Sequence, residues 1–254
     1  MKSTKTNLTA QIPSILTICM ILLIWQAVAV LQIVPDFMLP SPVSVGKALV
    51  NDFPLLMQHA RYTVLEAMLG LTVGILIGFL CAVFMDHFDI VYKALYPIII
   101  ITQTIPTVAI APLLILWLGY EMAPKVVLIV IVTFFPISIG LLEGFRSADT
   151  DMIRLMQSMG ATRIQIFRHI KLPSAMGQFF SSLRISVSYS IVGAVISEWL
   201  GGYYGLGVYM TRVKSAYAFD RMFAVIIAIS ALSLVLMWLV DLVQKVCMPW
   251  ENVK

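Results

Sequence analysis

The sequence predicts an all-α fold, that of a polytopic membrane protein with six transmembrane helices in a single domain over residues 1–254. Of these residues, 60% are hydrophobic and only 12% are charged, whereas a soluble domain of this size needs more charge on its surface. A helix needs about 20 apolar residues to span the hydrocarbon core of a bilayer. Six stretches approach this length, at residues 6–35, 67–85, 94–120, 126–142, 179–200 and 222–240.

The positions of the basic residues predict the orientation of these helices. If the N-terminus lies inside and the spans alternate, the inside segments hold 11 of the 17 Lys and Arg residues and the outside segments hold 6. Because cytoplasmic segments carry such an excess, we expect both termini and the polar segment 143–184 to be cytoplasmic. The net charge of +4 then reflects topology, and no basic run with interleaved aromatic residues points to nucleic acid.

The first apolar stretch follows Lys2 and Lys5, as the hydrophobic part of a signal peptide would. Cleavage after Ala29 is the alternative to a retained helix, but the stretch is longer than the usual run of about 7 to 15 apolar residues, and several spans follow it. In the external segment that comes next, Pro40 and Pro42 favour extended backbone. Ser44 is expected to cap a short interfacial helix there.

The second span carries three glycines on one helical face, Gly70, Gly74 and Gly78. Small residues at this spacing let the backbone of a neighbouring helix approach closely. We therefore expect this face to be a helix-packing surface.

The third span contains Pro97, Pro106 and Pro112, which remove backbone hydrogen bonds and bend a helix. In a membrane, irregular backbone is tolerated where protein or a water-filled cavity covers it. The polar residues beside the central proline, Gln103 and Thr104, therefore place Gln103, Thr104 and Pro106 on a candidate substrate path. Simple kinked packing is the alternative.

The cytoplasmic segment predicts a helix, a glycine, a second helix and a proline. Residues 147–150 offer capping side chains for a helix that runs to Met159, and Gly160 can end it in the left-handed conformation. Thr162 and Gln165 match a capping box, and a second helix is expected from about Arg163 until Pro173 stops it. Such a hairpin either lies on the membrane surface or docks into a cleft of a partner protein.

The same segment resembles the cytoplasmic loop of binding-protein-dependent ABC importer permeases. Gly160 and Pro173 stand at the spacing of that family's pattern, within ATRIQIFRHIKLP, whereas Arg154, Leu155 and Met156 replace its Glu-Ala-Ala. The similarity covers about residues 35–245 and includes IPTVAIAPLLILWLGY, FFPISIGLLEGFRSAD and SLRISVSYSIVGAVISEWLGG.

The resemblance implies a type I ABC importer permease fold in the plasma membrane. It implies partners: a second copy of the permease in a homodimer, two cytoplasmic ATPase subunits and an external substrate-binding protein. It also implies that ATP and Mg bind to the ATPase and not to this chain. The coupling loop would span about residues 143–180, with these residues contacting the ATPase: Met159, Gly160, Ala161, Thr162, Arg163, Ile164, Phe167 and Pro173.

The resemblance also narrows the substrate to a small organic solute. The version SEWLGG–GLGVYM is most similar to permeases for pyrimidine precursors of thiamine. The same branch serves aliphatic sulfonates, taurine, nitrate and riboflavin precursors, which are the alternatives. An ion-coupled secondary transporter is the alternative of another class, but we find neither its inverted repeat nor ionisable residues at mid-membrane.

Glu198 is the one acidic residue deep in an apolar stretch, toward its outer end. It reaches water at the interface, caps the turn at Gly201–Gly202, or takes part in the substrate path. In the last case Trp199 and Tyr203 are candidate stacking partners for a flat ligand.

Nothing in the sequence predicts catalysis by this chain. The pair Gly46–Lys47 lacks the remainder of a P-loop, so ATP hydrolysis is expected from a separate subunit. The three cysteines and three histidines are scattered, without the spacing of a metal site.

Overall fold

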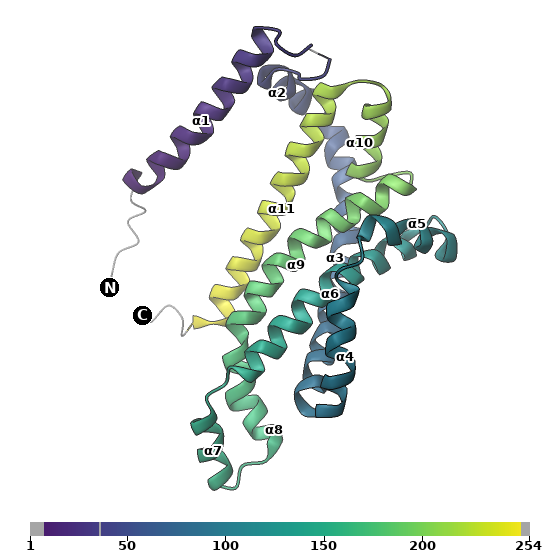
Figure 1. Cartoon of the computed structure of the whole chain (residues 1–254). Coiled ribbons are helices and arrows are strands. Elements are labelled where there is room, and N and C mark those ends of the chain that lie inside the picture. The colour runs from purple at the N-terminus through teal and green to yellow at the C-terminus, as the bar shows by residue number, and fades with distance from the viewer. Residues whose placement is uncertain (1–7, 36, 250–254) are drawn as a thin grey trace. The chain divides into compact units, whose positions relative to one another are not determined.

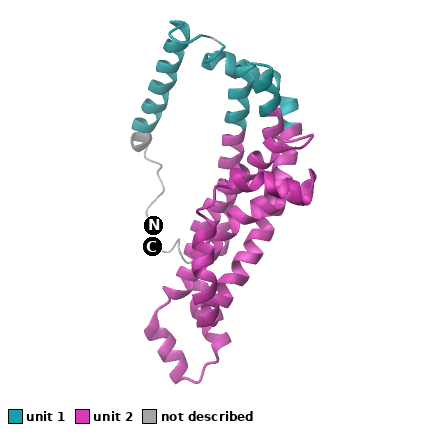
Figure 2. Ribbon diagram, turned by 45° about the vertical axis from the view of Figure 1, so that its right-hand side comes forward, with its two compact units in different colours: residues 1–57, 210–228 teal, residues 58–209, 229–254 magenta. Residues whose placement is uncertain are grey.

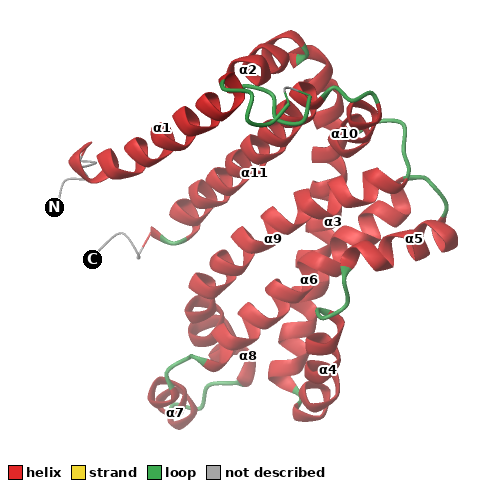
Figure 3. Ribbon diagram, turned by 45° about the horizontal axis from the view of Figure 1, so that its top comes forward, coloured by secondary structure: helices red, strands yellow, loops and turns green. Residues whose placement is uncertain are grey.

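A computed structural model describes residues 8–35 and 37–249, and every regular element within these ranges is a helix (Figures 1 and 3). The basic terminal residues Lys2, Lys5 and Lys254, which contribute to the predicted orientation, lie outside the described residues. In chain order the helices are α1 (Leu8–Val30), α2 (Pro42–Asn51), α3 (Phe53–His87), α4 (Asp89–Thr102), α5 (Thr107–Leu118), α6 (Met122–Arg146), α7 (Thr150–Ser158), α8 (Arg163–Ile166), the π-helix η1 (Phe167–Lys171), α9 (Leu172–Leu200), α10 (Leu206–Ser215) and α11 (Phe219–Cys247).

Five helical segments among the described residues are long and apolar enough to cross a membrane: Ile12–Val30, Phe53–His87, Met122–Arg146, Arg163–Leu200 and Phe219–Cys247. The sixth expected span is divided into α4 and α5, which meet at 100°. The break lies between Thr102 and Thr107, because Pro106 has no N–H to donate and forces the residue before it out of the helical region. The prediction of six spans therefore holds if this bent pair is counted as one.

The chain forms two compact units, which Figure 2 colours separately. Unit 1 comprises residues 1–57 and 210–228, and unit 2 comprises residues 58–209 and 229–254. The functional features described below all lie in unit 2. The single domain expected from the sequence stays a prediction.

In unit 1, α2 begins directly after Ser41, whose side chain accepts a hydrogen bond from the backbone N–H of Ser44 at 3.2 Å. The prediction that Ser44 is the cap is therefore wrong by three residues. Pro42 occupies the first helical position, where a missing N–H leaves no hydrogen bond unmade. The helix then buries Val45 against Ala224.

In unit 2, α3 packs against α6 through the glycine stripe, as the sequence predicts. A Cβ added to Gly70 would lie 2.5 Å from Cβ of Ile129, and one added to Gly74 would lie 2.2 Å from Oγ1 of Thr133. Gly78 meets the same face of α6 one turn further along. Only glycine allows this approach of the two helices.

Helix α6 also packs closely along α9, and Figure 1 shows the two helices running side by side. A Cβ on Gly144 would lie 2.7 Å from Cα of Ala175, and Gly140 lies against the side chain of Ser182. Helix α6 is therefore the central helix of unit 2, and α3 and α9 are its close neighbours.

The second helix of the polar segment 143–184 does not stop at Pro173, contrary to the prediction. Helices α8, η1 and α9 form one segment of 38 residues, Arg163–Leu200. In the π turn, the N–H of Leu172 bonds to the carbonyl of Phe167, five residues earlier. A proline clashes with the carbonyl four residues before it, and the wider π turn directly before Pro173 relieves that conflict.

Candidate functional site

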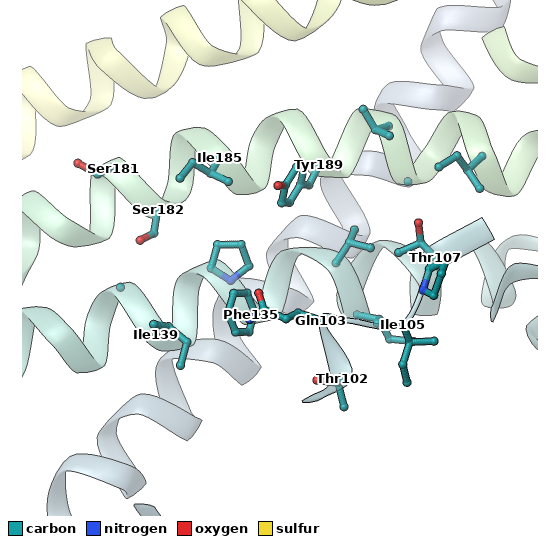
Figure 4. A pocket seen from close by; sticks show the side chains of 18 of the residues that line it. Thr102, Gln103, Ile105, Thr107, Phe135, Ile139, Ser181, Ser182, Ile185 and Tyr189 are labelled. Atoms are coloured by element: carbon teal, nitrogen blue, oxygen red, sulfur yellow. The ribbon is translucent and has the colours of Figure 1, made fainter. Parts of the chain in front are cut away.

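A cavity of about 690 Å³ opens at the break between α4 and α5. The connection between these helices forms one wall, and α6 and α9 form the others (Figure 4). Gln103 and Pro106, two residues predicted for the substrate path, line the cavity, whereas Thr104 is not among the lining residues. The lining residues are Thr102, Gln103, Ile105, Pro106, Thr107, Ile131, Val132, Phe135, Pro136, Ile139, Gly140, Glu143, Gln178, Ser181, Ser182, Ile185, Tyr189, Val192, Gly193 and Ile196.

The cavity wall is mostly apolar, with a few neutral polar groups. Figure 4 shows Tyr189 on α9, Phe135 on α6 and Gln103 at the α4–α5 connection. Its volume is within the range of pockets that hold small organic ligands, about 300–1,000 Å³. A wall of this kind suits an uncharged or weakly polar molecule.

The α7–α8 hairpin, which lies between α6 and α9, is built as the sequence predicts. The carboxylate of Asp149 caps α7 by accepting from the N–H of Asp151 at 2.8 Å. At the other end, Gly160 adopts φ +79°, and the N–H of Ala161 bonds to the carbonyl of Met156 at 2.9 Å. This is the hydrogen bond of a Schellman motif, which ends a helix and reverses the chain.

The capping box that starts α8 is also confirmed. The backbone N–H of Thr162 donates to Oε1 of Gln165 at 2.7 Å, and the N–H of Gln165 donates to Oγ1 of Thr162 at 3.4 Å. At the tip of the hairpin, the side chains of Met159 and Ile164 are 77% and 78% exposed. Local hydrogen bonds therefore present an apolar tip to the surroundings.

The residues predicted for ATPase coupling divide into two groups in the structure. Residues 159–164 form the tip, whereas Phe167 packs its ring 5.2 Å from that of Phe145 on α6, and Pro173 lies in the first turn of α9. The isoleucines of this segment divide in the same way, since Ile164 is exposed and Ile170 is buried. Phe167 thus connects the hairpin to the core of unit 2.

Glu198 lies in a buried polar cluster, and its side chain has almost no solvent-exposed surface. The residue is 1% exposed, and its carboxylate accepts hydrogen bonds from the hydroxyl of Thr63 at 2.7 Å and from the backbone N–H of Gly207 at 2.6 Å. The alternatives of an acid in contact with water, or of a cap on the Gly201–Gly202 turn, are therefore wrong. The residue it caps lies further along, in the first turn of α10.

Two further side chains complete this arrangement at the start of α10. The N–H of Leu206 donates to Oγ1 of Thr63 at 2.9 Å, and the N–H of Gly205 donates to Nδ1 of His59 at 3.1 Å. Three consecutive backbone N–H groups that a helix start leaves without an intrahelical partner thus receive acceptors from α3 and α9. The carboxylate also lies near the positive end of the helix dipole.

An ion pair lies beside these groups, between Lys125 of α6 and Glu66 of α3, with Nζ and Oε1 2.6 Å apart. Both side chains are at most 8% exposed. We call five residues the outer cluster, after the side of the membrane that the sequence predicts for them: His59, Thr63, Glu66, Lys125 and Glu198. Sequence reasoning named only Glu198, although the spacing of the three α3 residues, at 59, 63 and 66, places them on one helical face and could have indicated them.

The last two residues predicted for the substrate path, Trp199 and Tyr203, are 44% and 83% exposed and do not line the cavity. The neighbouring Tyr204 stacks on Tyr62, with ring centroids 4.6 Å apart. The predicted path residues therefore do not form one site. Gln103 and Pro106 line the cavity and Thr104 lies beside them in the α4–α5 connection. Glu198 belongs to the outer cluster, and Trp199 and Tyr203 are exposed at and after the end of α9.

Comparison with known proteins shows similarity to permease subunits of ABC transporters. Residues 74–246 match the family described as binding-protein-dependent transport system inner membrane component. A probable ABC transporter permease protein of Haemophilus influenzae is 37% identical over 89% of this chain and 93% of its own length.

Two relatives have names that state a substrate. The formylaminopyrimidine transport permease protein ThiX of Halalkalibacterium halodurans is 31% identical over 92% of this chain and 93% of its own. The riboflavin transport system permease protein RibX of Chloroflexus aurantiacus is 31% identical over 92% and 88%. Among solved structures, a MetNI methionine ABC transporter in an inward-facing conformation gives a TM-score of 0.66 at 18% identity, covering 77% of this chain and 97% of that one, which is a similarity of fold.

Proposed function

The chain belongs to the family of binding-protein-dependent transport system inner membrane components, and from this premise we propose how it is driven and what it imports. It is a multi-pass membrane protein and a permease subunit of an ABC importer with the type I permease fold, as the sequence predicted. Because the chain belongs to this family, the alternative prediction of an ion-coupled secondary transporter is wrong. ATP hydrolysis belongs to a separate subunit.

We propose that the α7–α8 hairpin transmits the motion of an ATPase subunit to the membrane helices. The observation that carries this proposal is its exposed apolar tip: α7 buries no residue, and Met159 and Ile164 expose more than three quarters of their surface. Exposed apolar groups held rigidly are typical of a protein-binding site. Phe167 and the continuous helix into α9 then provide the connection from the tip to the cavity wall.

In the proposed assembly, two copies of this chain form a homodimer, and each hairpin contacts one of two cytoplasmic ATPase subunits that bind ATP and Mg. A substrate-loaded binding protein docks on the outside, and both termini of the permease are cytoplasmic, in the plasma membrane. ATP binding would favour one of two global conformations by several kcal/mol, on the order of what a shift from a minor to a major population needs.

The coupling proposal is tested with Ile164→Asp in the permease co-expressed with its ATPase and reconstituted with its binding protein. We expect transport-coupled ATP hydrolysis to fall at least tenfold, while the thermal unfolding temperature of the permease stays unchanged because the side chain is exposed. Ile164→Leu and the exposed polar variant Ser158→Asp are the matched controls and should retain coupling. Full coupled activity in Ile164→Asp would contradict the proposal and favour a hairpin that only rests on lipid.

For the substrate, we propose a small organic solute, with a pyrimidine precursor of thiamine first. The support is the formylaminopyrimidine permease among its relatives. The riboflavin permease has the same identity to this chain, so riboflavin is the second candidate, ahead of aliphatic sulfonates, taurine and nitrate. A thermal-shift screen of the partner binding protein against these compounds ranks them, and stabilisation by taurine or a sulfonate alone would overturn the order.

A further inference from the structure

Among the described residues, no Lys or Arg lines the cavity at the α4–α5 break, and Glu143 is the one formally charged residue in its wall. Two arginines lie within a few residues of these lining positions in the sequence.

Both of these arginines are held elsewhere. Arg184, which lies between two lining residues of α9, places Nε 2.8 Å from Oδ1 of Asp241 and also donates to Gln244. Arg146, three residues after Glu143, lies over the ring of Tyr92 at 3.7 Å. The structure therefore directs the available positive charge away from the cavity.

An anionic solute would be disfavoured in such a cavity. A sulfonate or nitrate that enters it loses part of its hydration without gaining a positive partner, and burying an unpaired charge is costly. The carboxylate of Glu143 adds repulsion of the same sign. A neutral solute meets neither penalty.

The neutral polar groups of the wall match a flat ring with donors and acceptors. The side-chain amides of Gln103 and Gln178 make no hydrogen bond to other groups in the described part of the chain, and each offers two donors and an acceptor. Tyr189 is 49% exposed and lines the same cavity, as Figure 4 shows. An aromatic ring of this kind stacks on flat heteroaromatic molecules.

We propose that this cavity binds the transported solute as a neutral, flat heteroaromatic molecule and excludes anions. Tyr189 is the stacking platform, and the amides of Gln103 and Gln178 bond to the polar edge of the ring. The inference rests on the proposed import function and adds a selectivity site in the permease itself. It favours pyrimidine and flavin solutes over taurine, sulfonates and nitrate.

The test measures the permease–ATPase complex in detergent, without the binding protein, so that the selectivity of that protein does not enter. Three probes are used: riboflavin, methanesulfonate and the aminopyrimidine that supplies the ring of thiamine. Calorimetric titration measures the binding of each. We expect binding of at least one ring compound and none of methanesulfonate. Tyr189→Ala should weaken ring binding about tenfold or more, whereas Tyr189→Phe should retain most of it.

A charge-inserting variant, Gln178→Arg, tests the exclusion of anions. It should weaken ring binding and allow methanesulfonate to bind, because the new cation compensates the anion. The matched control is Trp238→Ala, an exposed aromatic residue of α11 that is not part of the cavity wall, and it should bind as the wild type does.

The outcomes separate this inference from the proposed function. If the wild type binds methanesulfonate as well as the rings, or if Tyr189→Ala and Gln178→Arg leave ring binding unchanged, the inference is wrong while ATP-driven import stands. If the reconstituted wild type with ATPase and binding protein shows no ATP-dependent uptake of these probes, nor of taurine or nitrate, the proposed function itself fails.

Discussion

The α7–α8 hairpin and the outer cluster are built in opposite ways. The hydrogen bonds that shape the hairpin from α7 to α8 join residues close in the sequence, such as Thr162 and Gln165, three residues apart. The long-range bond of this segment lies beyond the hairpin, in η1, where Lys171 donates to Asp86 at 2.8 Å. In the outer cluster, Thr63 and Glu198 are 135 residues apart, and Gly205 and His59 are 146 apart. The hairpin therefore holds its own shape, whereas the outer cluster exists only in the folded unit.

This difference in hydrogen bonding fits the roles expected of the hairpin and of the outer cluster. The exposed tip of the hairpin keeps its shape through local caps when a partner moves it. The Phe167–Phe145 contact and the Lys171–Asp86 ion pair of η1 then connect it to the core of unit 2. The outer cluster joins α3, α6, α9 and the start of α10 through buried polar groups, which are costly to separate. We therefore expect changes in the outer cluster to affect stability, and changes in the hairpin to affect coupling.

The largest effect is expected from Glu198→Ala. The change leaves the Thr63 hydroxyl and the Gly207 N–H buried without their acceptor, at about 1–3 kcal/mol each. Together these costs are about 2–6 kcal/mol, so thermal unfolding in detergent should show a decrease in Tm of roughly 4–24 °C, at about 2–4 °C per kcal/mol. Glu198→Gln keeps one acceptor oxygen, so its Tm should decrease less. If Glu198→Ala has the same Tm as the wild type, the cluster does not stabilise the fold.

Gly205→Ala should come next in size. Gly205 adopts φ +129°, and an added Cβ would lie 2.2 Å from Cδ of Glu198. Strained backbone and overpacking each cost about 1–3 kcal/mol, so Tm should fall by several degrees. If hydrogen exchange at Leu206 and Gly207 remained slow in this variant, the close contact between the Glu198 carboxylate and Gly205 would not be needed to hold the start of α10.

Gly160→Ala is the matched change in the hairpin and should have a smaller effect on stability. Its φ is +79°, but no atom lies within 4 Å of an added Cβ, so only the left-handed backbone costs about 1–2 kcal/mol. The hairpin should exchange amide hydrogens faster and coupled ATP hydrolysis should fall, with the global Tm unchanged. A decrease in Tm as large as that of Gly205→Ala would show that the two regions are not independent.

Thr162→Ala should have the smallest effect. It removes one side of the capping box, worth about 1 kcal/mol, and should increase hydrogen exchange only at the start of α8. Thr72→Ala on α3, whose hydroxyl bonds only to the carbonyl of Met68, is the control and should leave the hairpin unchanged. Equal exchange in both variants would mean that packing around Phe167, and not the cap, holds the helix start.

The sequence predicted the locally bonded hairpin better than the long-range contacts of the outer cluster. The caps at Asp149–Met152, Gly160 and Thr162–Gln165 could be recognised because donor and acceptor lie within one turn of each other. The glycine stripe could be recognised because spacing alone places it on one face. The break at Pro106 was expected as a bend, but the 100° angle and the cavity beside it depend on the packing of α6 and α9.

By itself, the sequence determined the membrane class, the hairpin and the family, because hydropathy, capping and motif spacing are local properties. Only the tertiary structure decided that Glu198 is buried against Thr63 and α10, that the helix continues through Pro173, and that Arg184 points to Asp241 and away from the cavity. These outcomes depend on which groups meet after folding. Burial, charge pairing and close packing are properties of contacts between distant segments, and no window of the chain contains them.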